Sequence, residues 1–194
     1  MSHNQATLTN KRVLLGITGG IAAYKTPDLV RKLAELGAQV RIVMSRGAEQ
    51  FVTPLALQAV SGHMPHNAAM TAESESGMGH IDLARWADIV LVAPATANFI
   101  AQLNQGSGHD LLTTVCLATT ASVVVAPAMN QQMWKNSTTA ENVVSLTERG
   151  VAFLGPDSGE QACGDVGPGR MLQPEDLAQQ LAGLFQTRIL EGKK

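Results

Sequence analysis

Short apolar runs rich in β-branched residues alternate with helical stretches along this chain, and this alternation constrains its fold most strongly. Most of the runs are apolar at every position, which is typical of parallel strands covered on both faces. The runs predicted as strands are Val13–Ile17, Val40–Met44, Ile89–Ala93, Val123–Ala126 and Val151–Leu154. The pattern predicts a three-layer α/β/α, doubly wound domain of Rossmann or flavodoxin-like type.

Helical periodicity fills the stretches between these runs. The first helix begins at Thr26-Pro27-Asp28 and ends near Gly37, or it begins nearer Ile21 and kinks at Pro27. Further helices are predicted over residues 51–60, 81–86, 97–103, 110–118, 140–149 and 174–190. Residues 62–78 are polar and irregular, so we expect the most mobile loop there.

Composition indicates one compact domain. The 194 residues are 45% hydrophobic and carry a formal net charge of −2, which gives no electrostatic footprint for nucleic acid. No apolar run reaches the ~18 residues of a membrane span. We expect a loose segment over residues 1–10 and a single domain over 11–194. Cys116 and Cys163 lie in such different settings that we expect no disulfide framework and a cytoplasmic protein.

The segment Gly155–Met171, GPDSGEQACGDVGPGRM, is rich in glycine and has no apolar periodicity. We predict a loop, because loops hold binding and catalytic groups more often than cores do. The thiol of Cys163 is either reachable by a ligand there or an incidental feature of a glycine-rich surface turn.

Four predicted strands end in distinctive turns, and ligands of open parallel sheets bind beyond such ends. Gly19 and Gly20 precede a helix start and would offer backbone N–H groups to a mononucleotide phosphate, although glycine also serves packing at such turns. The turn has neither the dinucleotide-binding nor the Walker spacing. Ser45 either donates to the same phosphate or caps a turn.

The other two turns carry amide side chains. Thr96 is explained by helix capping, whereas Asn98 suits the edge of a heterocycle. Asn130 follows a buried strand and either binds a carboxylate or amide or is a turn residue. His80 begins a short helix, where histidine is commonly exposed. Arg85 follows it and pairs either with a phosphate or with Asp82 or Asp88.

Five sequence blocks together resemble one family, the homo-oligomeric flavin-containing cysteine decarboxylases. The blocks run in order from Thr18 to Met171: TGGIAAYKTPDLVRKL, TPLALQAVSG, GHIDLARWADIVLVAPATAN, VAPAMNQQMW and GPDSGEQACGDVGPGRM. The resemblance implies a six-stranded parallel sheet between helices. It also implies an active site between the subunits of a homotrimer, which some members assemble into a dodecamer.

The resemblance also implies roles for particular residues, with FMN as the cofactor and no metal. The family's catalytic positions fall on His80, Asn130 and Cys163. The FMN cradle falls on Gly19, Gly20, Ile21, Ser45, Thr96, Asn98 and Ala128. Contacts to the substrate are expected from Asn130, Arg85, Ala162 and Met171.

The implied reaction is the FMN-dependent decarboxylation of 4′-phosphopantothenoylcysteine to 4′-phosphopantetheine in coenzyme A biosynthesis. Loss of CO2 from an N-acylated cysteine needs an electron sink, and oxidation beside the sulfur, with FMN as acceptor, would provide a thioaldehyde. Asn130 would hold the carboxylate without a charge, His80 would assist proton movement, and Cys163 would protonate the resulting enethiolate.

Several alternatives stay open. The chain departs from the family pattern at Phe99 and at Gly108-His109-Asp110, which could alter the flavin surroundings. Other candidates are a decarboxylase of peptide C-terminal cysteines, a flavin prenyltransferase, a plain FMN carrier, and a non-catalytic regulatory subunit. Many bacterial relatives continue into a phosphopantothenate–cysteine ligase, so this chain is either part of a bifunctional protein or a stand-alone enzyme with a possible ligase partner.

Overall fold

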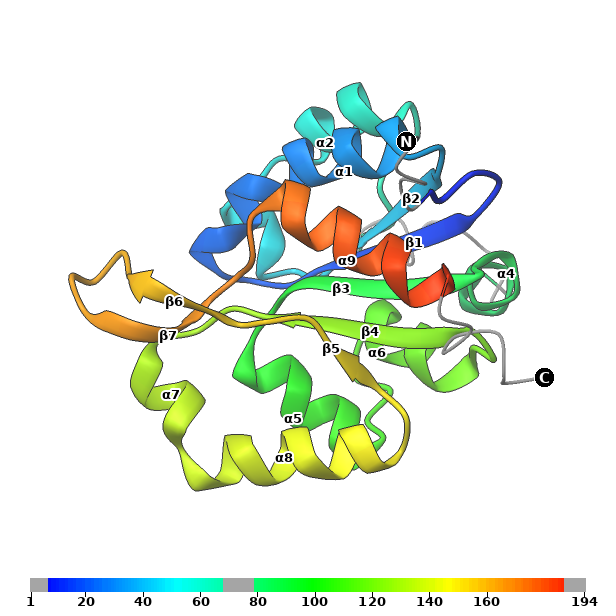
Figure 1. Ribbon diagram of the computed structural model, residues 1–194. Coiled ribbons are helices and arrows are strands. Elements are labelled where there is room, and N and C mark those ends of the chain that lie inside the picture. Colours follow the sequence, from blue (N-terminus) through cyan, green and yellow to red (C-terminus); the bar gives the residue numbers. More distant parts are fainter. Residues whose placement is uncertain (1–6, 68–78, 187–194) are drawn as a thin grey trace.

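A parallel sheet forms the centre of the molecule (Figure 1). The computed structural model describes residues 7–67 and 79–186, and within these ranges the sheet has five strands in the order β2-β1-β3-β4-β5. The strands are β1 (Arg12–Ile17), β2 (Gln39–Met44), β3 (Ile89–Ala95), β4 (Ser122–Pro127) and β5 (Ala152–Phe153). This order, with its switch point between β1 and β3, is that of the flavodoxin-like folds. The predicted fold class is confirmed.

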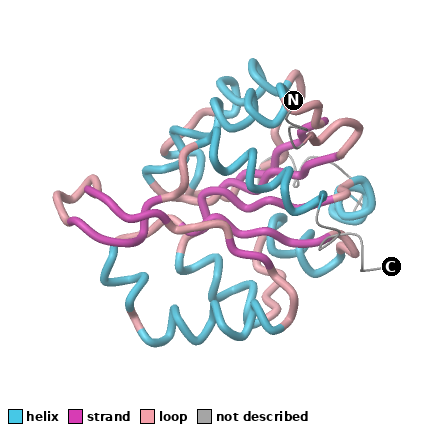
Figure 2. The backbone as a smooth tube through the Cα atoms, in the orientation of Figure 1, coloured by secondary structure: helices cyan, strands magenta, loops and turns pink. Residues whose placement is uncertain are grey.

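Helices cover both faces of the sheet (Figures 1 and 2). Helices α1, α2 and α9 pack with the core on one face, and α4, α5, α6 and α8 pack on the other. The helices are η1 (Ile21–Lys25), α1 (Thr26–Glu35), η2 (Ala48–Gln50), α2 (Pro54–Ser61), α4 (Gly79–Trp86), α5 (Ala97–Gln105), α6 (Leu111–Ala118), α7 (Gln131–Lys135), α8 (Ser137–Glu148) and α9 (Pro174–Gln186). All seven residues of β3 are buried, as its uninterrupted apolar sequence predicts.

Both readings of the first helix describe part of the structure. A 3₁₀ helix begins at Ile21 and continues directly as α1 from Thr26. Pro27 lies in the first turn of α1, where its missing N–H has no helical partner to lose.

Capping side chains set helix starts that apolar periodicity places a few residues away. The helix predicted over 51–60 begins at Pro54, because Thr53 accepts a hydrogen bond from the amide of Ala56. The helix predicted over 140–149 begins at Ser137, because Asn136 caps it. Helix α9 is described as far as Gln186, and the remainder of its predicted range lies outside the described residues.

The expected sixth strand is reduced, within the described residues, to one isolated parallel bridge outside β2. His66 pairs with Val43, donating its amide to Ile42 and accepting from the amide of Met44, each at 2.8 Å. Most of the predicted mobile loop, residues 68–78, lies outside the described residues.

The glycine-rich segment Gly155–Met171 is more ordered than the predicted loop. The strands β6 (Asp157–Glu160) and β7 (Val166–Arg170) form an antiparallel hairpin. It is fastened to the end of β4, where the amide of Met129 donates to the carbonyl of Gly169 at 2.9 Å. The loop prediction is therefore wrong for these strands, which are held by main-chain pairing rather than by β-branched side chains.

The ordered domain begins before residue 11. Leu8 is fully buried and donates its amide to the carbonyl of Leu36 at 2.8 Å. Leu8 therefore belongs to the core and not to the loose segment expected over residues 1–10. Residues 1–6 lie outside the described residues.

Candidate functional site

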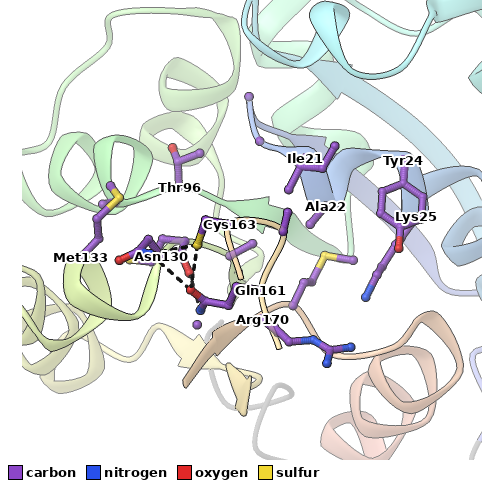
Figure 3. A pocket seen from close by; sticks show the side chains of 18 of the residues that line it. Ile21, Ala22, Tyr24, Lys25, Thr96, Asn130, Met133, Gln161, Cys163 and Arg170 are labelled. Atoms are coloured by element: carbon purple, nitrogen blue, oxygen red, sulfur yellow. Dashed lines mark hydrogen bonds between the residues drawn. The ribbon is translucent and has the colours of Figure 1, made fainter. Parts of the chain in front are cut away.

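A cavity of about 700 Å³ lies at the carboxyl ends of β1, β3 and β4, and the hairpin β6–β7 forms part of its wall (Figure 3). This position, beside the topological switch point, is where open α/β sheets bind ligands. The wall is formed by Gly19, Gly20, Ile21, Ala22, Tyr24, Lys25, Thr96, Ala97, Ala128, Met129, Asn130, Met133, Glu160, Gln161, Ala162, Cys163, Gly169, Arg170 and Met171.

A buried threonine fixes the two strand ends at the switch point relative to each other. The hydroxyl of Thr18 donates to the carbonyl of Pro94 at 2.7 Å and accepts from the amide of Thr96 at 3.1 Å. Thr96 then caps α5, accepting from the amide of Phe99. This bonding sets the width of the crevice between the turns that follow β1 and β3.

The two glycines after β1 have different surroundings. A Cβ atom on Gly19 would lie 2.9 Å from the Cα and carbonyl carbon of Gly47, so the two backbones approach too closely for a side chain. A Cβ on Gly20 would meet only a methyl of Thr96, at 3.9 Å. Gly19 therefore serves packing, and Gly20 leaves open space beside the cavity.

The predicted cofactor residues divide into two groups. Those on the cavity wall are Gly19, Gly20, Ile21, Thr96 and Ala128. Ser45 and Asn98 are absent from the wall that the described residues form. Ser45 follows β2 and donates its amide to Ile17, whereas Asn98 is exposed in the first turn of α5.

The fold brings Asn130 and Cys163 together from positions 33 residues apart. The side-chain nitrogen of Asn130 lies 3.4 Å from the Cys163 sulfur, 3.4 Å from Gln161 Oε1 and 2.8 Å from Asp165 Oδ2. Its side-chain oxygen accepts from the amide of Gln132 and caps α7. Figure 3 shows Asn130, Gln161 and Cys163 gathered on one side of the cavity.

His80 and Arg85 are not brought to the cavity within this chain. Both lie on α4, which leads into the amino end of β3, whereas the cavity lies at the carboxyl end. In Figure 1, α4 and the hairpin β6–β7 are at opposite ends of the molecule. The other two predicted substrate contacts, Ala162 and Met171, line the cavity.

Sequence reasoning missed a group of wall residues that includes two cations. Lys25 and Arg170 lie together on the side of the cavity away from Asn130 (Figure 3). Burial, and then the charge of Arg170, lower the pKa of Lys25. Neither cation forms an ion pair with a carboxylate in the described ranges. The sequence alone gives no signal that the side chain of Lys25, in the 3₁₀ helix after Gly20, lines a cavity.

Apolar side chains surround the cavity mouth. Ile21 is 58% exposed, Tyr24 62% and Met133 48%, although all three line the cavity. They provide a surface for a flat aromatic ligand or for another chain. Phe99 and His109, which depart from the family pattern, are absent from the wall that residues 7–67 and 79–186 form. Phe99 is buried in the core beside α6, and His109 is exposed.

The described residues contain neither a membrane-spanning helix nor a metal-binding cluster. No helix there is long and apolar enough to cross a membrane. No group of three or more histidine, cysteine or acidic residues in the same ranges could hold a metal ion.

The fold and the cavity together define a flavodoxin-like α/β protein with a ligand site at its switch point. The family model described as Flavoprotein matches residues 1–186, and the chain belongs to this family.

Curated relatives are about twice as long as the matched region. The coenzyme A biosynthesis bifunctional protein CoaBC of Vibrio parahaemolyticus is 55% identical over 187 residues, which cover 96% of this chain and 47% of the relative. The protein of the same name from Bacillus subtilis is 44% identical, with the same two shares covered. The chain thus spans about half the length of these relatives.

Solved structures agree over most of the chain. A PPC decarboxylase mutant complexed with pantothenoylaminoethenethiol superposes with a TM-score of 0.81 at 32% identity, covering 91% of this chain and 98% of that one. The FMN binding protein AtHal3 superposes with a TM-score of 0.77 at 34% identity, covering 91% and 97%.

Proposed function

We propose that this chain binds FMN and decarboxylates 4′-phosphopantothenoylcysteine to 4′-phosphopantetheine, a step of coenzyme A biosynthesis. The observation that carries the proposal is the contact between Asn130 and Cys163 on the wall of a cavity at the switch point. The names of the CoaBC relatives and of the PPC decarboxylase structure support the choice of substrate.

The cavity suits FMN in size and in lining. Its volume lies within the usual range for cofactor sites, and Gly20 leaves a bare backbone beside it. Gly19, Gly20 and Ile21 would hold the phosphate with Ser45, and Thr96, Asn98 and Ala128 would hold the remainder. Bound FMN would supply a two-electron acceptor and donor. The protein residues then have to bind, orient and protonate the substrate.

Asn130 would hold the substrate carboxylate through its side-chain N–H. A neutral donor binds a carboxylate without the strong ground-state stabilisation that a lysine or arginine would give, so it opposes the loss of CO2 less. Ala162 and Met171, which line the same cavity, would contact the rest of the cysteine unit. Cys163, whose sulfur lies 3.4 Å from the Asn130 nitrogen, would donate the proton that the enethiolate needs after CO2 leaves.

The opposite side of the cavity is suited to the phosphate of the substrate. Lys25 and Arg170 are the cations there, and neither forms an ion pair with a carboxylate in the described ranges. A substrate with a carboxylate at one end and a phosphate at the other would match this distribution of a neutral amide and two cations.

We propose that His80 and Arg85 act from a neighbouring copy of the chain in a homotrimer, which in turn could form a dodecamer. Both lie far from the cavity of their own chain, and the exposed apolar mouth offers a surface for a neighbour. Mixing the impaired variants His80→Ala and Asn130→Ala tests this. A rise in activity above that of either variant alone supports a shared site, and mixed trimers no more active than the separate variants contradict it.

Two further proposals concern the setting of the protein. The bifunctional relatives support a phosphopantothenate–cysteine ligase as a fused or associated partner. Both cysteines are free, which supports a reducing, cytoplasmic location.

The purified chain should be yellow or become so with FMN, and it should release CO2 from 4′-phosphopantothenoylcysteine. A peptide ending in cysteine is the matched control, because it offers the same thiol and carboxylate without the pantothenoyl phosphate. Turnover of the peptide alone would favour the peptidyl-cysteine decarboxylase alternative. Failure to bind FMN would favour the regulatory alternative.

A further inference from the structure

The carboxamide of Asn130 is fixed in one of its two orientations by partners on both sides. Its oxygen accepts the amide N–H of Gln132 at 2.8 Å. Its nitrogen lies 2.8 Å from a carboxylate oxygen of Asp165. A main-chain N–H can only donate and an ionised carboxylate can only accept, so the oxygen must face α7 and the nitrogen must face Asp165.

The two hydrogens of the Asn130 nitrogen are used unequally. One makes the short bond to Asp165, and the other is shared between Gln161 Oε1 and Cys163 Sγ, both at 3.4 Å. The second hydrogen is therefore weakly held and available to an acceptor in the cavity. Asp165 itself is not among the described residues that line the cavity, so it supports the amide from behind.

The turn that carries Cys163 and Asp165 is closed by a main-chain hydrogen bond, and it is also bonded to the residues on either side of Asn130. The amide of Gln161 donates to the carbonyl of Asp165 at 2.8 Å, and its side-chain oxygen accepts from the amide of Gln131 at 3.0 Å. The side-chain nitrogen of Gln161 also donates to the carbonyl of Met129 at 3.3 Å. The turn and the start of α7 therefore form one bonded unit.

We infer that Asp165 is a positioning residue that orients the carboxamide of Asn130, so that one N–H is directed into the cavity beside the Cys163 thiol. The inference adds to the proposed function a residue that touches neither substrate nor cofactor. It rests on the proposed decarboxylation for its rate measurements only, since the orientation of the amide is independent of the substrate.

The first test compares Asp165→Ala with Asp165→Asn in the full, FMN-loaded protein. A misplaced catalytic group can cost about 100-fold in rate, so CO2 release should fall by about 10- to 100-fold in the alanine variant. The asparagine variant should recover much of the rate, because its side-chain oxygen can still accept from Asn130. FMN affinity and the melting temperature should stay close to wild type.

The exposed carboxylate of Asp176 on α9 provides a control of the same chemical type. Asp176→Asn should leave CO2 release within about twofold of wild type, as for a surface change. Equal loss in both Asp165 variants, or loss accompanied by weaker FMN binding, would overturn the positioning role.

A double-mutant cycle tests whether Asp165 acts through Asn130. Once Asn130→Ala has removed the carboxamide, adding Asp165→Ala should lower residual CO2 release by no more than about twofold. If the fold loss of CO2 release in the double variant equals the product of the losses in the two single variants, Asp165 acts by another route and the inference is wrong.

Nuclear magnetic resonance distinguishes failure of this inference from failure of the proposed function. The side-chain NH₂ signals of Asn130, assigned by their loss in Asn130→Ala, should shift clearly in Asp165→Asn and hardly at all in Asp176→Asn. If the wild type releases no CO2 but this shift is seen, the proposed function fails and the orientation stands. An unshifted signal overturns the inference even in an active decarboxylase.

Discussion

Two adjacent glycines after β1 allow packing and ligand binding to be separated by the same substitution. Gly19→Ala places a methyl group 2.9 Å from two backbone carbons of Gly47. Gly20→Ala places one 3.9 Å from a methyl of Thr96, which is an ordinary contact. Gly20 has φ −163° and ψ 158°, an extended conformation that alanine also adopts.

The expected magnitudes follow from these contacts. Carbon atoms pack best at about 3.5–4.0 Å, so the Gly19→Ala methyl overlaps backbone that has no rotamer to change. Overpacking of this kind costs about 1–3 kcal/mol, and each 1 kcal/mol lowers the melting temperature of a domain this size by about 2–4 °C. Gly20→Ala should be neutral or stabilise by about 0.5 kcal/mol, because alanine restricts the unfolded chain.

Gly20→Ala should lower the affinity for FMN rather than the stability of the fold. Its methyl group stands beside the cavity and should weaken FMN binding by about tenfold, equivalent to about 1.4 kcal/mol, without loss of stability. Thermal unfolding of the apoprotein and quenching of FMN fluorescence measure the two effects. A destabilised Gly20→Ala, or a Gly19→Ala as stable as wild type, would refute the reasoning from backbone contacts.

Three further outcomes are expected. Asp88→Asn should cost about 1 kcal/mol near neutral pH, a value discounted because Arg12 and Asp88 are 42% and 31% exposed. The hydrogen bond from Arg12 lowers the pKa of Asp88, so the stabilisation is complete above the unfolded pKa of about 3.9 and is lost as pH falls through the folded pKa. Urea unfolding at a pH below the folded pKa of Asp88 should therefore give the same free energy of unfolding for the wild type and for Asp88→Asn. Leu8→Ala should cost about 3 kcal/mol, and an unchanged melting temperature would show that Leu8 adds nothing to the core. Cys163→Ser should release CO2 but accumulate a product two hydrogens short of 4′-phosphopantetheine, and normal turnover would contradict the role of Cys163.

Much of the fold could be predicted because apolar strands report burial on both faces. Ile89–Ala93 lies in β3, at the centre of the sheet, where such a sequence belongs. The hairpin could not be predicted in the same way. Val166 is the only β-branched residue of β6 and β7. The two strands are held by main-chain pairing with each other and by the bond from the amide of Met129 to the carbonyl of Gly169. Leu8 was missed because one leucine among polar residues has no periodicity.

The site could be predicted where a side chain follows a strand of the sheet. Asn130 comes three residues after the end of β4, so its place at the carboxyl edge follows from the topology. His80 and Arg85 come before β3, and the same topology places them toward the other edge of their own chain. Lys25 was missed because a helical lysine gives no sign, in sequence alone, that its side chain lies along a cavity.

The distribution of these residues separates the proposed chemistry into two parts. The amide of Asn130, the thiol of Cys163 and the carboxylate of Asp165 are held by one bonded unit in a single chain, so their mutual geometry does not require a neighbour. The imidazole of His80 can reach this unit only from another copy, because α4 lies at the other end of the sheet from the hairpin. Assembly would therefore control the proton movement assigned to His80, while the orientation of Asn130 beside Cys163 would already be set in each chain before assembly.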